Sequence, residues 1–200
     1  MERTYQKKNY DVLIKVVHTI LVWVVRAMYI GIGILVVAFL ASLFIPKSVY
    51  EFDLANIENI NVQVAHFMYN FNGSIFTGVV NVKWFVNLLL IAGVVNASFF
   101  LYLLMMLRNV LGNVKEKQPF SDQNILSLKR MGLAYLLAGV ILPAINTWLL
   151  WVIVKLVDLS SAGVNYSLNL QLIFMGIVIV ILAYVFEYGA YLQEEHDATV

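Results

Sequence analysis

Residues 84–107 read WFVNLLLIAGVVNASFFLYLLMML, a stretch without a single Asp, Glu, Lys or Arg. A helix needs about 20 mostly apolar residues to cross roughly 30 Å of hydrocarbon at about 1.5 Å per residue. Three other uncharged apolar stretches are long enough to do this: residues 27–45, 131–154 and 169–186. We therefore predict an all-α membrane protein, built as a four-transmembrane-helix bundle.

The composition of the whole chain supports the same class. Hydrophobic residues make up 62% and charged residues 12% of the sequence, against roughly 45–50% and 25% in soluble domains. A soluble domain of 200 residues has too little interior to bury so much apolar surface. The absence of cysteine excludes disulfides and cysteine nucleophiles. A net charge of +1 gives no general attraction to nucleic acid.

The distribution of lysine and arginine predicts the orientation of the spans, because positive residues near span ends stay in the cytoplasm. Most of them flank the first span or separate the second from the third: Arg3, Lys7, Lys8, Lys15, Arg26, Arg108, Lys115, Lys117, Lys129 and Arg130. The other side has only Lys47, Lys83 and Lys155. We therefore place both termini, the 108–130 loop and the 187–200 tail in the cytoplasm. Residues 46–83 form the outer loop.

A polar stripe precedes the first span. Asp11, Lys15, His18, Val22 and Arg26 recur at helical spacing within an otherwise apolar region. This pattern predicts an N-terminal amphipathic segment over about residues 10–25. The segment would lie at the inner membrane interface or project below the bundle.

The outer loop carries strand signals. Residues 59–64 alternate polar and apolar side chains, which is the period of a half-buried strand. Asn72-Gly73 is a typical tight-turn pair, and the β-prone run 75–82 follows it. We predict a small extracytoplasmic β-hairpin here, serving as a ligand or partner surface or as a cap over the helix ends.

The sequence lacks the motifs of common enzymes. It contains no phosphate-binding loop, no dinucleotide fingerprint and no His-Glu-x-x-His zinc motif. Gly31 and Gly33 lie inside an apolar helix and are better explained by close packing. His18, His66 and His196 fall in three separate regions, which does not suit haem ligation. We expect no enzymatic activity, no cofactor and no metal.

Polar residues inside the spans are candidates for function. They are Asn87 and Asn96 on the second span and Asn146, one turn after Pro143, on the third. Pro143 leaves one backbone carbonyl without its helical donor. These groups would line a polar cavity or, as we favour, form hydrogen bonds between helices. Gly93 and Ala97, four apart, predict a close helix contact on the second span.

One ion pair is predicted from depth. Counted from Pro46 and Asn169 at about 1.5 Å per residue, Arg26 and Glu187 lie at nearly the same level. An unpaired charge at the hydrocarbon edge is costly. We therefore predict a structural clamp between Arg26 and Glu187, joining the first and fourth spans.

The cytoplasmic loop and tail are the candidate surface for a partner. In the loop, Gly112 and Pro119 interrupt the helices, and Ser121 is a suitable N-cap. The predicted docking residues are Lys115, Lys117, Pro119 and Phe120 in the loop and Glu194 and Glu195 in the tail. Other interpretations remain: the lysines attract anionic lipid of the bilayer or serve only as a topology signal, and the tail is a solvated chain end.

Two motifs resemble a known family. Lys117-Gln-Pro-Phe-Ser121 before Leu128-Lys-Arg-Met-Gly132, and the ending Gly189-Ala-Tyr-Leu-Gln-Glu-Glu-His-Asp-Ala-Thr-Val200, are similar to bacterial membrane proteins filed as domain of unknown function 2975. Ala198 stands where that family usually has Leu. The family has no established activity, so the resemblance implies no catalytic residues. Its members are often encoded beside a small helix-turn-helix regulator, which implies a DNA-binding protein as partner.

Together these observations predict a non-enzymatic membrane protein that acts by binding, as an adaptor, a sensor or a subunit of a larger membrane complex. The alternative is a small transporter or channel component. Four helices with so few polar groups enclose little space, so that alternative requires a homo-oligomer. It also requires Asn87, Asn96 and Asn146 to line one cavity.

Overall fold

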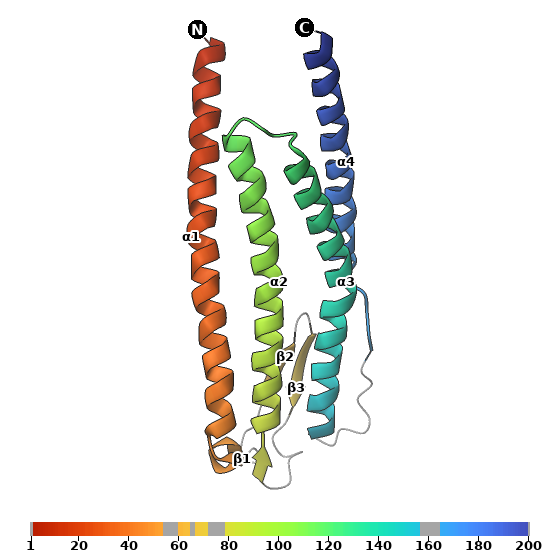
Figure 1. Cartoon of the computed structure of the whole chain (residues 1–200). Coiled ribbons are helices and arrows are strands. Elements are labelled where there is room, and N and C mark those ends of the chain that lie inside the picture. Colours follow the sequence, from red (N-terminus) through yellow and green to blue (C-terminus); the bar gives the residue numbers. More distant parts are fainter. Residues whose placement is uncertain (1, 54–59, 65–66, 72–78, 157–164, 200) are drawn as a thin grey trace. The chain divides into compact units, whose positions relative to one another are not determined.

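The computed structural model describes residues 2–53, 60–64, 67–71, 79–156 and 165–199. In chain order the elements are α1 (Glu2–Phe44), η1 (Lys47–Tyr50), β1 (Glu51–Asp53), β2 (Ile60–Val64), β3 (Phe67–Phe71), β4 (Val79–Asn81), α2 (Lys83–Lys115), α3 (Asp122–Leu156) and α4 (Leu170–Thr199) (Figure 1). Within these residues, four helices are long and apolar enough to cross a membrane, over Val12–Phe44, Lys83–Lys115, Asp122–Val152 and Leu170–Ala198. The prediction of four helices with the length and composition of membrane spans is therefore confirmed.

The N-terminal polar stripe is not a separate element. Residues 10–25 belong to α1, which is helical without interruption from Glu2 to Phe44. Leu21 and Val25 on this part of the helix are buried. No proline occurs before Pro46 and the glycines are confined to positions 31 and 33, so no helix breaker separates the stripe from the span.

The chain divides into two compact units. The first contains Met1–Gly31, Ala97–Gly139 and Asn169–Val200, and the second contains Ile32–Asn96 and Val140–Leu168. We refer to them as unit 1 and unit 2 and describe each by itself.

Unit 1 has a core shared by three helices. Its buried members come in pairs from α2, α3 and α4: Leu103 and Val110, Leu128 and Met131, and Ile179 and Ala183. α1 contacts α2 at Tyr29, whose hydroxyl lies 3.3 Å from the sulfur of Met105. In this unit the two chain ends lie on the same side as the α2–α3 connection (Figure 1).

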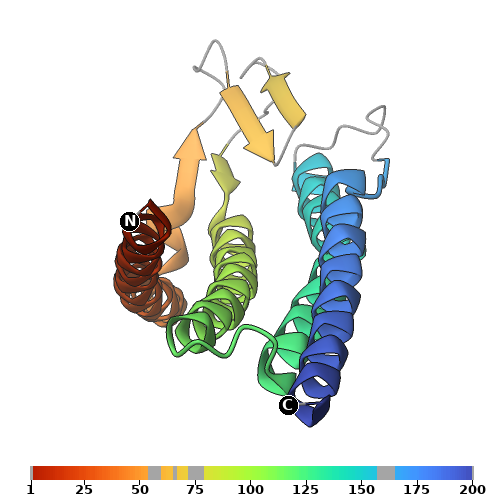
Figure 2. The same ribbon diagram turned by 90° about the horizontal axis from the view of Figure 1, so that it is seen from above.

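Glycines bring α3 and α4 together within unit 1. A Cβ atom on Gly176 of α4 would lie 2.9 Å from the carbonyl oxygen of Gly132 on α3. A Cβ on Gly139 would lie 2.5 Å from the side chain of Ile173. Both distances are shorter than van der Waals contact, so only glycine permits this backbone approach. The two helices run side by side in both views of the ribbon (Figure 1, Figure 2).

In unit 2 the end of α1 is held by the start of α2. The Lys83 ammonium group donates to the carbonyls of Leu43 and Ile45 at 3.2 and 2.7 Å. The last carbonyls of a helix lack helical donors and carry partial negative charge, so a lysine there stabilises the helix end. β1 and β4 pair beside it, antiparallel, with Glu51 opposite Asn81.

The strands of unit 2 pair differently from the predicted hairpin. β2 covers the alternating residues as expected, but its partner is β3, with Ile60 opposite Phe71 and Val64 opposite Phe67. β4 pairs with β1 instead. The predicted turn at Asn72-Gly73 lies outside the described residues. The correction is that the strand paired with β2 begins at Phe67, before the predicted turn.

Candidate functional site

The candidate site is the end of unit 1 that carries the α2–α3 loop, and its first feature is the way α2 stops. The backbone N–H of Lys117 donates to Val114 O at 3.0 Å, and that of Gln118 donates to Asn113 O at 2.9 Å. These two bonds form a Schellman motif, whose turning residue has positive φ and is usually glycine. Here it is Lys117, with φ of 63°. A side chain at this position costs about 1 kcal/mol relative to glycine.

The loop that follows is fastened by one buried side chain, Asn124 on the first turn of α3. Its amide nitrogen donates to the carbonyl of Pro119 at 2.9 Å and lies 3.4 Å from that of Gln118. Its amide oxygen accepts a hydrogen bond from Asn113 at 2.8 Å. Asn124 is fully buried. It therefore joins the end of α2, the loop and the start of α3 in a single network.

The loop also contacts the beginning of the tail. Phe120 packs edge-on against Phe186 of α4, with ring centroids 5.4 Å apart. A Cβ on Gly189 would lie 2.7 Å from the Phe120 ring, so the ring rests on the bare backbone of α4. We call Phe120, Phe186 and Gly189 the loop–tail contact. It brings together the two motifs that carry the family resemblance.

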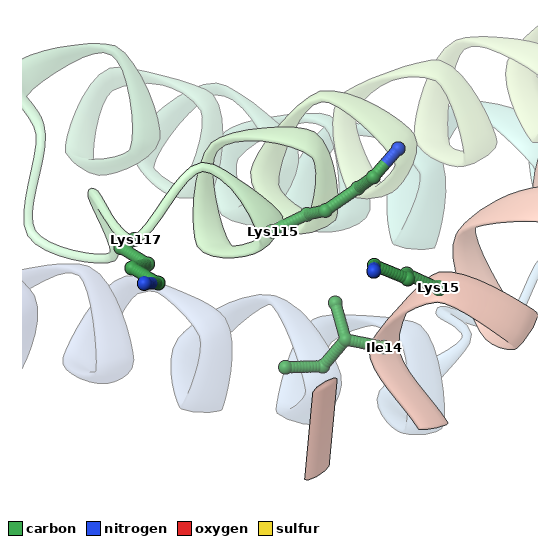
Figure 3. A pocket seen from close by; sticks show the side chains of 4 residues that line it. All are labelled: Ile14, Lys15, Lys115 and Lys117. Carbon is green, nitrogen blue, oxygen red and sulfur yellow. The ribbon is translucent and has the colours of Figure 1, made fainter. Parts of the chain in front are cut away.

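A cavity of about 240 Å³ lies beside this loop, lined by Ile14, Lys15, Lys115 and Lys117. We call it the lysine cavity. Lys15 comes from α1, whereas Lys115 and Lys117 come from the end of α2 (Figure 3). All three lysines are exposed. Within the described residues, none of them pairs with a carboxylate.

The predicted ion pair between Arg26 and Glu187 is wrong. Both carboxylate oxygens of Glu187 lie 2.9 Å from the ammonium nitrogen of Lys129. Arg26 instead lies over the ring of Trp23, 5.1 Å from its centroid. The expectation that the Glu187 carboxylate, at the predicted edge of the hydrocarbon, pairs with a cation is met by Lys129 in place of Arg26. The partner comes from α3 because the glycine contacts hold α3 against α4, whereas α1 contacts α2.

The polar residues of the predicted spans lie in unit 2, and two of them have partners within the protein. The buried Asn87 accepts a hydrogen bond from the Ser42 hydroxyl of α1. Asn96 donates to the carbonyl of Ala92, one turn back on its own helix, at 2.8 Å. Asn146 is half-buried. The first bond joins two helices, as the packing interpretation requires.

Pro143 does not interrupt α3, which continues to Leu156. Lacking an N–H, it leaves the carbonyl of Gly139 without a helical donor. The backbone N–H of Asn169 fills this position at 2.9 Å. The Asn169 side chain also accepts from Leu172 N at 3.1 Å and caps α4. The freed carbonyl therefore fixes the start of α4 against α3.

The predicted docking residues differ in their surroundings. In the loop, Lys115 and Lys117 are exposed and line the lysine cavity, Pro119 is half-buried, and Phe120 is partly covered by α4. In the tail, Glu194 and Glu195 are exposed residues of α4, and they do not form a separate peptide.

The histidines and glycines show where the sequence interpretation was incomplete. His18 is half-buried near Gly112 of α2, and His66 lies outside the described residues. Among the described residues no group of three His, Cys, Asp or Glu could hold a metal ion. Gly31 and Gly33, interpreted as packing residues, face open space. Gly93 makes only an ordinary contact with Leu35, at 3.6 Å.

Sequence reasoning missed Asn124 and the glycines of α3 and α4. The signal for Asn124 was its place three residues after the N-cap position, in the first turn of an otherwise apolar helix. The signal for the glycines was the spacing of Gly132 and Gly139, two turns apart on one face of α3. Neither signal can be interpreted from the sequence alone, because each requires knowing which helices are neighbours.

No curated protein and no solved structure matches the chain. A family model described as "Protein of unknown function (DUF2975)" matches residues 55–200. The match covers α2, α3, α4 and both motifs joined by the loop–tail contact. The chain therefore belongs to the DUF2975 family of proteins of unknown function.

Proposed function

We infer that the chain is a multi-pass protein of the bacterial inner membrane, with both termini in the cytoplasm. It acts without catalysis, by binding, as an adaptor, a sensor or a subunit. Its partner is a small helix-turn-helix regulator, which docks on the α2–α3 loop and the tail. The paired strands of unit 2 then lie on the extracytoplasmic side.

The observation that carries this proposal is the loop–tail contact. Loop and tail are distant in sequence, but the Phe120 ring rests on Phe186 and Gly189. Asn124 fixes the loop from the other side. A surface that is already ordered loses less conformational entropy when a partner binds. The basic loop and the acidic end of α4 offer both signs of charge to such a partner.

The orientation is supported by the distribution of lysine and arginine along the chain. The α2–α3 loop carries the positive residues that remain in the cytoplasm by the positive-inside rule. Both termini lie on the same side of unit 1 as this loop (Figure 1). The α1 segment before Arg26 is amphipathic in sequence and would lie at the inner headgroups, with its apolar side chains against the acyl chains.

Chemical cross-linking in native membranes tests the proposal. The tagged protein is cross-linked, purified in detergent and analysed by mass spectrometry. We expect links from Lys115 or Lys117 to a small DNA-binding protein. Links chiefly to a second copy of the chain, or to a large membrane complex, would contradict the regulatory role.

A further inference from the structure

The lysine cavity lies near one end of two helices that can cross a membrane. Lys15 lies three residues into the candidate span Val12–Phe44 of α1, and Lys115 is the last residue of the candidate span Lys83–Lys115 of α2. Lysines at the ends of spanning helices lie at the level of the lipid headgroups. Ile14 gives the cavity one apolar wall between the charged ones (Figure 3).

The helix dipole explains only part of the charge of this cavity. Lys115 is the last residue of α2 and Lys117 follows the helix, so both lie where a cation offsets the helix dipole. That account does not cover Lys15, which belongs to α1. It also does not explain why Lys117 has a positive φ of 63°, where glycine is free of strain. Glu116 lies between the two loop lysines in sequence but does not line the cavity.

We call three exposed apolar residues of α1 beside the cavity, Val12, Val16 and Trp23, the α1 stripe; Leu13 and Ile20 on the neighbouring face are exposed to a similar extent. Val12, Val16 and Trp23 are 55%, 49% and 63% exposed. By helical spacing, Val12 and Trp23 lie on the face next to Lys15, three residues before it and eight after it. The stripe leads from the lysines into the part of α1 that can cross a membrane.

We propose that the lysine cavity binds the phosphate of an anionic phospholipid, whose acyl chain lies along the α1 stripe. Three ammonium groups supply charge-assisted donors for phosphate oxygens, and lysine is a common phosphate ligand. Basic pockets between spanning helices on the cytoplasmic side suit such headgroups. One amphiphile thus accounts for both the three lysines of the cavity and the exposed apolar residues of α1 beside them.

This inference goes beyond the proposed function and does not depend on it, although Lys115 and Lys117 belong to both surfaces. A lipid in the cavity would compete with a partner for these two lysines. Loss of lipid binding with partner cross-links intact overturns only the lipid site. Intact lipid binding without any cytoplasmic partner overturns only the adaptor role.

The test uses the full chain purified in neutral detergent and titrated with fluorescent phosphatidylglycerol. We expect saturable binding that unlabelled phosphatidylglycerol displaces and phosphatidylcholine of the same acyl chains does not. The triple variant Lys15→Gln/Lys115→Gln/Lys117→Gln should lose roughly 100-fold in affinity, at about fivefold per lysine. The matched control Lys7→Gln/Lys8→Gln/Arg130→Gln removes the same charge from the same predicted side and should retain binding.

A second variant separates folding from binding. Lys117→Gly places the preferred residue at the turn, so its thermal unfolding temperature should rise. Its affinity for phosphatidylglycerol should nevertheless fall about fivefold relative to the wild type. The variant Lys117→Arg, which keeps the charge, should bind phosphatidylglycerol with the affinity of the wild type. If Lys117 had only a structural role, Lys117→Gly would be more stable than the wild type and would bind phosphatidylglycerol with unchanged affinity.

Three outcomes would overturn the proposal. The triple variant could bind phosphatidylglycerol as the wild type does, which would place the lipid elsewhere. Inorganic phosphate could displace the fluorescent lipid as well as phosphatidylglycerol does, which would assign the cavity to a free anion. An acidic protein that co-purifies with the wild type and resists displacement by phosphatidylglycerol would assign the lysines to a partner instead.

Discussion

At the residue scale, Glu187 is an acidic residue that directly follows the apolar stretch of α4 and is held by Lys129 of α3. The side chains are 37% and 50% exposed for Lys129 and Glu187. For such a partly exposed pair we expect a coupling free energy of about 1 kcal/mol at most. Lys129 also lies 5.2 Å from the ring of Tyr184, so its stem is held on α4 by a second contact.

A double-mutant cycle tests this pair. Lys129→Met, Glu187→Gln and the double variant are compared by thermal unfolding in detergent. The double variant should be less destabilised than the sum of the single ones, by about 0.5–1 kcal/mol. The same cycle with Arg26→Gln in place of Lys129→Met is the control and should show no coupling. Coupling of Arg26 but not Lys129 to Glu187 would contradict the structure.

Asn124 provides the second prediction at this scale. Replacing it with Ala removes the donor to Pro119 and the acceptor for Asn113, both of which lie in a buried network. We expect a loss of about 1–3 kcal/mol in unfolding free energy and faster proteolysis of the loop. Gln123→Ala, at the exposed neighbouring position, should leave both unchanged. Equal effects of the two variants would show that Asn124 does not fasten the loop.

At the element scale, α3 and α4 are joined by close backbone approach at their glycines, in addition to the Lys129–Glu187 ion pair. Gly132, Gly139 and Gly176 leave no room for a Cβ atom, because backbone or side-chain atoms of the facing helix lie within 3 Å of that position. The carbonyl freed by Pro143 adds a backbone hydrogen bond from Asn169. In lipid, where the hydrophobic effect does not drive helices together, such close contacts provide much of the association.

Gly176→Ala tests this contact. Its Cβ would lie 2.8 Å from Leu136 Cγ and 2.9 Å from Gly132 O, so the helices must separate. We expect a destabilisation of about 1–3 kcal/mol, measured as loss of helical circular dichroism on heating in detergent. Gly31→Ala is the matched control, because nothing lies within 4 Å of its Cβ. It should be neutral or stabilising by up to about 1 kcal/mol, since Ala favours the helix. A larger loss in Gly31→Ala than in Gly176→Ala would refute the packing described.

The sequence predicted helices well and their partners poorly. Uncharged apolar length gives a spanning helix whatever lies next to it, so all four were identified. The partner of Glu187 depends on which helix is its neighbour, and neither Arg26 nor Lys129 reveals that in sequence. The strand at Ile60, Val62 and Val64 was visible from alternation, but its pairing with β3 was not. The contact between Phe120 and Gly189 was not predicted either, because the two residues are distant in sequence.

At the scale of the whole molecule, the orientation can be measured directly. We expect green fluorescent protein fused after Val200 to fluoresce, and alkaline phosphatase fused there to be inactive. Alkaline phosphatase inserted between residues 53 and 60 should be active, because that loop is predicted to be extracytoplasmic. The reverse pattern would place the lysines outside and remove the basis for a cytoplasmic partner.

The central claim is that loop and tail form one docking surface joined by Phe120 and Gly189. Site-specific photo-cross-linking in living cells tests it most directly, with the photoreactive residue placed at Gln118, at Glu194 or, as a control, at Lys47. The account predicts that Gln118 and Glu194 cross-link to the same cytoplasmic protein, that Lys47 does not, and that Phe120→Ala weakens both links together. Links from Gln118 and Glu194 to two different proteins, each unaffected by Phe120→Ala, would contradict it.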